Sequence, residues 1–181
     1  MEIIATGIDG LIEIIPQVFG DHRGYFFEAY HKNKFIEAGV TVDFVQDNQS
    51  FSAPNVLRGL HFQEGEYAQG KLVRVIKGKV LDIAVDIRPN SPTFGQHYTC
   101  ILDDQRQNML YVPEGFAHGF LTLEESVFFY KCTNYYNKAS ENGILWNDPV
   151  LNIDWRTNNP KISEKDQELP SFEEYKNSLN L

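Results

Sequence analysis

Two β-rich segments flank a single glycine in the middle of the chain. Residues 71–76 and 80–87 are rich in Val, Ile and Leu, and a Lys-Gly-Lys turn around Gly78 separates them. Such arms on either side of a glycine predict an antiparallel β-hairpin. Because side chains alternate along a strand, the second arm has two faces. One face carries Leu81, Ile83, Val85 and Ile87, and the other carries Val80, Asp82, Ala84 and Asp86. A carboxylate on a face of small residues predicts a polar cavity on that side of the sheet.

Further short segments of strand character follow one another along the chain, separated by turn residues. They are residues 3–4, 11–15, 42–52, 97–102, 108–112, 116–120 and 126–133. Helical stretches are few: residues 31–39, a helix start at Ser163 and a capping box at Ser171. Since strands do not alternate with helices, the pattern predicts an all-β double-sheet sandwich or jelly roll with a few short peripheral helices. The periodicity fades after residue 133, where we expect the core to be complete.

Length and charge restrict the class of protein. A chain of 181 residues without a low-complexity linker predicts one domain, residues 1–181. The 16 basic and 25 acidic residues give a net charge of -9, which argues against nucleic acid as a partner but allows a local basic cluster for a small anion.

The cysteines and the hydropathy pattern indicate a cytoplasmic protein. Cys100 and Cys132 lie in apolar runs without CxxC spacing, so we expect core thiols rather than metal ligands. The sequence shows neither a signal peptide nor an apolar stretch long enough to span a bilayer, and we expect no membrane partner.

Groups of unlike chemistry gather between residues 58 and 86. Arg58, Lys71 and Asp82 lie near His61, whose apolar neighbours would hold an imidazole neutral and able to accept a proton. A histidine in an apolar strand is more often a hydrogen-bonded structural residue. The convergence of base, cations and carboxylate in one short span favours a functional site.

Other segments carry candidate binding groups. A glycine-bounded polar turn places Arg23 between Phe19 and Phe26, a combination that suits an anion and a flat ring, although these aromatic residues could instead belong to the core. Residues 46–49 offer amides and a carboxylate that either line a ligand site or lie on a solvated edge, and the pattern does not separate the two.

Three more residues have both a structural and a functional interpretation. Tyr130 shares a strand face with apolar residues, and a buried phenol needs a hydrogen-bond partner or a function. His118 is a second histidine embedded in a predicted strand. Asp166 is most simply a solvated acid in the first turn of a helix.

Eight runs of residues, in order along the chain, form one pattern. They are residues 19–24, 44–48, 55–63, 69–74, 113–120, 130–136, 144–148 and 163–166. Together they resemble the dTDP-4-dehydrorhamnose 3,5-epimerase family over nearly the whole chain. The resemblance implies a cupin-type jelly roll, a homodimer, and action on dTDP-4-dehydro-6-deoxy-D-glucose without a metal or organic cofactor, giving dTDP-4-dehydro-L-rhamnose. The apolar N-terminal strands are suited to joining a partner's sheet.

The resemblance also implies catalytic roles. Carbons 3 and 5 of the sugar flank the carbon 4 ketone, so loss of either proton gives an enolate, and a proton returned from the opposite face inverts the centre. His61 resembles the base, and Asp166 the carboxylate that orients it, which replaces the solvated interpretation of Asp166. Tyr130 resembles the acid on the far face, and Lys71 would stabilise charge on the carbon 4 oxygen.

The nucleotide sites implied by the resemblance are less specific. Arg23 and Arg58 suit the diphosphate, because guanidinium groups match phosphate oxygens. Phe19, Phe26 and Tyr136 could pack on the thymine or deoxyribose, partly from the neighbouring subunit. Further candidate contacts are Glu28, Gln46, Asn48, Asp82 and His118.

Three alternative functions remain open from the sequence. A related enzyme could invert only carbon 3, or isomerise the ketone, with the same base. A metal-dependent cupin oxygenase would need a closely spaced histidine pair, whereas His61 is followed by Gln63 two positions later. A non-catalytic nucleotide-sugar-binding module would be expected to lack His61, Tyr130 or the charged residues around them.

Overall fold

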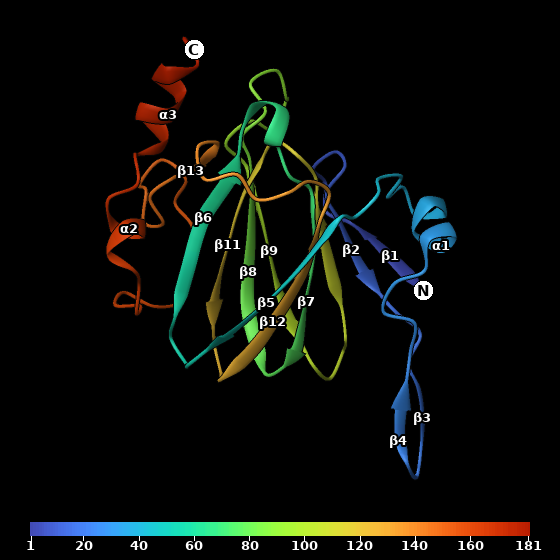
Figure 1. The fold of residues 1–181 in the computed structure, drawn as a ribbon. Helices are drawn as coiled ribbons and strands as arrows, with labels where there is room; N and C mark the ends of the chain where they lie inside the picture. The colour runs from blue at the N-terminus through green and yellow to red at the C-terminus, as the bar shows by residue number, and fades with distance from the viewer.

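Two antiparallel sheets form the body of the molecule (Figure 1). The structure is a computed structural model that describes residues 1–181. The six-stranded sheet has the order β1 (Glu2–Ala5), β2 (Ile12–Ile15), β10 (Met109–Val112), β7 (Lys71–Lys77), β12 (Ser126–Cys132) and β5 (Gln46–Ser52). The five-stranded sheet has the order β13 (Glu141–Gly143), β6 (Leu57–Gln63), β11 (Phe116–Thr122), β8 (Lys79–Asp86) and β9 (His97–Asp103). The predicted all-β, double-sheet jelly roll is confirmed.

Short elements surround the two sheets. Strands β3 (Phe19–Asp21) and β4 (Gly24–Phe26) form a separate hairpin that projects from the body (Figure 1). The helices are α1 (Lys32–Glu37), η1 (Gly65–Tyr67), α2 (Glu164–Gln167) and α3 (Phe172–Ser178). The predicted helix start at Ser163 and the capping box at Ser171 are both confirmed. None of the helices has the length and apolar character needed to cross a membrane.

The hairpin predicted around Gly78 is wrong. Strand β7 pairs with β10 and β12, whereas β8 pairs with β9 and β11, so the chain passes from one sheet to the other at this glycine. Gly78 has φ +89°, and a Cβ there would lie 2.2 Å from the carbonyl oxygen of Glu125. Its N–H donates to the Asp104 carboxylate at 2.8 Å. A glycine between two β-rich arms therefore marks a change of direction without specifying which strands pair.

The predicted alternation in β8 is correct and divides the core into layers. Val80 and Ala84 belong to the cluster between the sheets, with Phe120, Phe128 and others from both sheets. Leu81, Ile83 and Val85 point to the outer face of the five-stranded sheet. Both cysteines are buried and free, as predicted.

The C-terminal region completes the core, contrary to our expectation that the core ends near residue 133. Leu151, Trp155, Phe172 and Tyr175 pack on the outer face of the five-stranded sheet in one cluster with strand residues such as Leu60. This sheet is apolar on both faces, so its outer face has to be covered. The covering residues are spaced irregularly and give no strand or helix period, which explains why the sequence pattern did not reveal them.

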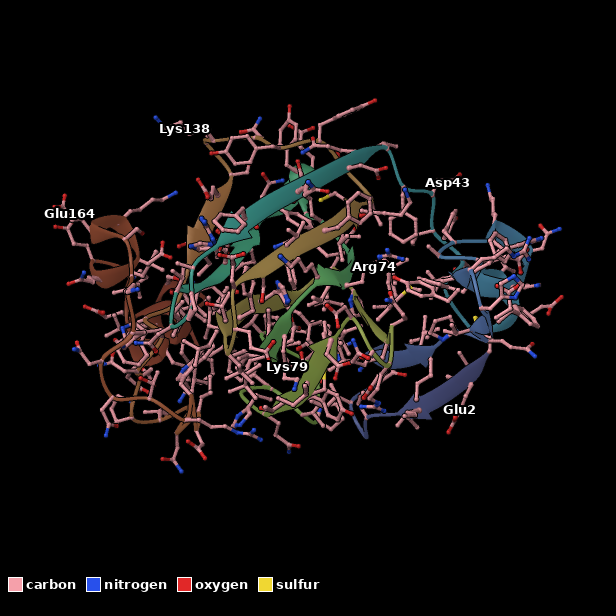
Figure 2. All side chains as sticks on the ribbon, turned by 90° about the horizontal axis from the view of Figure 1, so that it is seen from below. Glu2, Asp43, Arg74, Lys79, Lys138 and Glu164 are labelled. Atoms are coloured by element: carbon pink, nitrogen blue, oxygen red, sulfur yellow. The ribbon has the colours of Figure 1, made fainter.

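The outer face of the six-stranded sheet is only partly covered. Near α1, Phe35 and Val40 pack on Ile14 and other residues of this face. Farther along, Phe51 and Ile76 are exposed, and no group within the chain bonds to Nε or Nη1 of Arg74, although both atoms are enclosed. Figure 2, where Arg74, Glu2 and Glu164 are labelled, shows the N-terminal strands and the C-terminal helices at opposite ends of the molecule.

Removing the Phe172 ring tests the contribution of the C-terminal cover. We expect Phe172→Ala to lower the free energy of unfolding by about 3 kcal/mol, because the ring is 5% exposed and its loss leaves a cavity against the sheet. Urea unfolding measures the difference. Val150→Ala, at a side chain that is exposed in the same region, should stay within about 0.5 kcal/mol of the unmutated protein. Equal stability of the two variants would show that the cover contributes nothing to the core.

Candidate functional site

A cavity of about 540 Å³ lies between the two sheets. Its lining comes from both sheets and from the segment that leads into α2: Ser50, Val56, Leu57, Arg58, His61, Lys71, His118, Phe120, Phe128, Tyr130, Lys161, Ile162, Ser163 and Asp166. The structure thus brings together six of the residues selected from the sequence, which are Arg58, His61, Lys71, His118, Tyr130 and Asp166.

A hydrogen bond between His61 and Asp166 joins β6 to α2. His61 Nε2 lies 2.8 Å from Asp166 Oδ1, and the Gly59 N–H donates to Asp166 Oδ2 at 3.2 Å. The Ser163 hydroxyl caps α2 by accepting from the Asp166 N–H. Burial alone would raise the pKa of Asp166, but the hydrogen bonds from His61 and Gly59 outweigh it and hold that pKa below its ordinary value. Asp166 is therefore a buried carboxylate and not a solvated one, and it leaves Nδ1 as the ring nitrogen of His61 without a partner in the chain.

A β-bulge turns both Arg58 and His61 toward the cavity. Strict alternation would place residues three apart on opposite faces. On β11, His118 pairs with His61 and Phe120 with Arg58, so β6 carries one residue more than its partner between these pairs. The extra residue falls at Gly59, which has φ +128°. Its Cα lies so close to Gly119 on the neighbouring strand that a Cβ would be 2.5 Å from the Gly119 Cα.

Lys71 and Tyr130 reach the cavity from the six-stranded sheet, opposite His61. Burial lowers the pKa of the Lys71 ammonium and raises the pKa of the Tyr130 phenol. Lys71 Nζ donates to the carbonyl oxygen of His61 at 3.5 Å and has no carboxylate within ion-pair distance. Tyr130 thus stays a neutral phenol at neutral pH, with a proton to give.

His118 forms a second histidine–carboxylate pair in the cavity wall. Its Nε2 lies 2.9 Å and 3.1 Å from the two oxygens of Asp82, which is fully buried. Asp82 lies on the face predicted for it, but behind His118 and not on the cavity surface. Beside this pair, the rings of Phe120 and Phe128 stack with centroids 4.1 Å apart and give the cavity an apolar floor.

Gln46, Asn48 and Tyr136 lie next to the cavity without lining it. Strand β5 begins at Gln46, four residues later than predicted, and Asn48 pairs with Tyr130 across the sheet. Gln46 donates to Asn48 and accepts the backbone N–H of Tyr136. The exposed Tyr136 ring donates its hydroxyl to Glu141 at 2.9 Å.

The residues predicted around the N-terminal turn do not reach the cavity of their own chain. Phe19 and Phe26 are exposed on the β3–β4 hairpin, and Arg23 pairs with the neighbouring Asp21 at its tip. Glu28 follows the hairpin and pairs with Lys34. The hairpin and the C-terminal helices lie on opposite sides of the molecule (Figure 1).

Sequence reasoning missed several lining residues. Ser50 could have been found from the alternation of 46–52, since it shares a face with Gln46 and Asn48. Phe128 is one of the apolar residues that share a strand face with Tyr130, and it was not recognised as part of a site. Lys161 and Ser163 approach through an isolated bridge between Val56 and Lys161, and no local pattern announces that contact.

The arrangement is suited to moving protons at a carbon next to a carbonyl. A base from one sheet faces an acid from the other, and an ammonium lies near them to receive negative charge. No cluster of three or more His, Cys, Asp or Glu side chains able to hold a metal ion occurs in the chain.

Comparisons with known proteins point to one family. Residues 5–174 match the family model described as dTDP-4-dehydrorhamnose 3,5-epimerase. The chain is 52% identical over 177 residues to a dTDP-4-dehydrorhamnose 3,5-epimerase of Salmonella typhimurium, covering 96% of this chain and 97% of the relative. The crystal structure of such an enzyme from Elizabethkingia anophelis superimposes with a TM-score of 0.91 at 48% identity, covering 96% of this chain and 97% of the other.

A third comparison concerns an enzyme with a bound nucleotide sugar. It is the dTDP-6-deoxy-D-glucose-3,5-epimerase of Legionella pneumophila, crystallised with dTDP-4-keto-L-rhamnose. Its TM-score is 0.90 at 46% identity, and the alignment covers 94% of this chain and 92% of that one.

Proposed function

This chain belongs to the dTDP-4-dehydrorhamnose 3,5-epimerase family, and we propose that it converts dTDP-4-dehydro-6-deoxy-D-glucose into dTDP-4-dehydro-L-rhamnose in the cytoplasm. The observation that carries this proposal is the placement of His61 and Tyr130 on different sheets, facing one cavity. Inversion at carbons 3 and 5 needs a proton removed on one side of the ring and returned on the other. It requires no metal or organic cofactor.

His61 is the base in this proposal. Because Asp166 holds Nε2, the free Nδ1 takes the proton from carbon 3 or carbon 5. The electron pair of the broken C–H bond forms a carbon–carbon double bond, and the carbon 4 oxygen becomes an enolate. The nearby carboxylate of Asp166 then stabilises the imidazolium that forms.

Lys71 stabilises the enolate. Its ammonium is buried and has no carboxylate in contact, so its charge is available to the carbon 4 oxygen. One preorganised donor of this kind contributes about 3 kcal/mol to a transition state.

Tyr130 completes each inversion by giving its phenolic proton to the carbon from the opposite side. The phenolate then recovers a proton from water, and His61 releases one, which resets the site for the second carbon. The raised pKa of Tyr130 keeps the phenol protonated before the step.

The diphosphate and the nucleoside lie toward Arg58 and the mouth of the cavity. Arg58 lines the cavity with its guanidinium held by Ser52, and Tyr136, Gln46 and Asn48 lie beside it. Arg23 of a second chain supplies another phosphate contact, and Phe19 and Phe26 on the same hairpin stack on the base. Glu28 follows that hairpin. His118 contributes a further ligand contact from the cavity wall.

A homodimer supplies that second chain. Strand β1 is a free edge of the six-stranded sheet and exposes Ile3, and the open face of the same sheet exposes Phe51 and Ile76. The isolated position of the hairpin supports a role in the partner's cavity (Figure 1).

Substituting the base tests the reaction itself. We expect His61→Asn to fold and bind dTDP but to lose deuterium exchange at carbons 3 and 5 by about a thousandfold, because the substitution removes the imidazole that takes these protons. NMR of the substrate in heavy water counts the deuterons at each carbon and separates double inversion from inversion at carbon 3 alone. His97→Asn, on β9 outside the cavity, should exchange at the unmutated rate. Unchanged exchange in His61→Asn would refute the assignment.

Substituting the acid separates removal of the proton from its return. Tyr130→Phe keeps the packing of the ring and loses the hydroxyl, so we expect deuterium to enter the substrate with retained configuration while inverted product fails to form. An NMR time course in heavy water measures both. Tyr175→Phe, a buried tyrosine in the C-terminal cover, serves as the control. Normal inversion by Tyr130→Phe would mean that another group or a water molecule gives the proton.

Mixed dimers test whether the hairpin acts on the partner. We expect sedimentation to give a dimer, and Arg23→Ala and His61→Asn chains to be nearly inactive alone. Produced together, they should regain activity at about a quarter of the sites, because one site of each mixed dimer receives neither defect. No recovery, or a fully active monomer, would rule out the shared site.

A further inference from the structure

Asp82 is a carboxylate without solvent exposure that lies behind the cavity wall. It projects from β8 into the space between the sheets, where Phe120 and Cys100 are its neighbours on the adjacent strands. Its hydrogen-bonding partner is the imidazole of His118, which bonds to both carboxylate oxygens. Such a buried charge is costly unless it is paired and hydrogen-bonded, so the groups around Asp82 show what it does.

The first group that depends on Asp82 is His118. Because Nε2 faces the carboxylate, Nδ1 is the nitrogen left for a ligand, and it makes no hydrogen bond within the chain. His118 pairs with His61 across β11 and β6, so the two rings are neighbours and each is held by its own carboxylate. An oriented ring loses less freedom when a ligand binds.

The second group is Lys71. Its burial lowers the pKa of the ammonium, and nearby negative groups oppose this effect. The titratable groups that face it are Cys132 and Tyr130 from β12, Asp82 from β8, Glu141 from β13, His61 from β6 and His118 from β11. Glu141 is already paired with Lys165 at 2.6 Å, and burial raises the pKa of the Cys132 thiol, which therefore stays neutral.

We propose that Asp82 is a positioning residue that orients His118 toward the ligand and helps to keep the nearby Lys71 ammonium protonated, so that the reaction depends on a carboxylate that never touches the substrate. This inference rests on the proposed epimerase function. One buried anion would then serve groups from both sheets. Asp82 on β8 carries the negative charge, and it acts on the imidazole of His118 on β11 and on the ammonium of Lys71 on β7.

The substitution Asp82→Asn removes the charge and keeps the shape. Lys71 acts as the protonated ammonium, which is lost as pH rises through its pKa. Without Asp82 that pKa falls further, so the alkaline limb of kcat should move to lower pH by about half a unit or more. The KM should also rise, by about tenfold, because His118 is held less firmly. Both are measured from pH profiles of epimerisation.

Two further variants make the test specific. Glu13→Gln replaces another buried carboxylate, bonded to Tyr98 and Asn108 and outside the cavity, and should leave the alkaline limb in place. His118→Asn should raise the KM without moving that limb to lower pH, and it carries the test if Asp82→Asn does not fold. The inference would be overturned if His118→Asn moved the alkaline limb of kcat to lower pH, or if Asp82→Asn left that limb in place.

The same profiles distinguish failure of the proposed epimerase function from failure of the role inferred for Asp82. An inactive unmutated protein would contradict the proposed function. An active unmutated protein whose pH profile and KM are shared by Asp82→Asn would contradict only the role of Asp82.

Discussion

The hydrogen bond between His61 and Asp166 ties the site to the fold. Its partners are 105 residues apart, and they meet only because the C-terminal segment covers the outer face of the five-stranded sheet. Burial of Trp155 and Phe172 therefore does more than complete the core. The hydrophobic effect supplies the free energy of that packing, and the buried carboxylate is placed as a consequence.

Cations line the cavity, although the chain is acidic overall. Arg58 and Lys71 line it as cations, while the carboxylates around it are each engaged by a particular partner: Asp166 by His61, and Asp82 by His118. Exposed carboxylates elsewhere account for much of the net charge of -9. An anionic ligand thus meets a locally positive interior, where the lower dielectric constant strengthens each contact.

Local patterns predicted what depends on neighbours in sequence, and they failed where distant segments meet. Alternation gave the correct faces of β8 and of Tyr130, and capping residues gave the starts of α2 and α3. The pairing of β7 was missed, because a turn at Gly78 fits a hairpin and a passage between sheets equally well. His61 was selected as a candidate base from its apolar neighbours, but its pairing with Asp166 was predicted only from the family resemblance, since neither their contact nor the bulge at Gly59 has a local signature.

The close approach of Gly59 and Gly119 sets a rule for redesigning this scaffold. A Cβ on Gly59 would collide with Gly119, and a Cβ on Gly119 would lie 2.8 Å from the carbonyl oxygen of Arg58. The two glycines therefore act as one unit, although they are 60 positions apart in the chain. A designer who transfers this cavity to another jelly roll has to move both glycines together with the side chains of His61, Lys71, Tyr130 and Asp166. A library that varies either position alone would force the backbones of the two strands apart, however well the reactive groups were chosen.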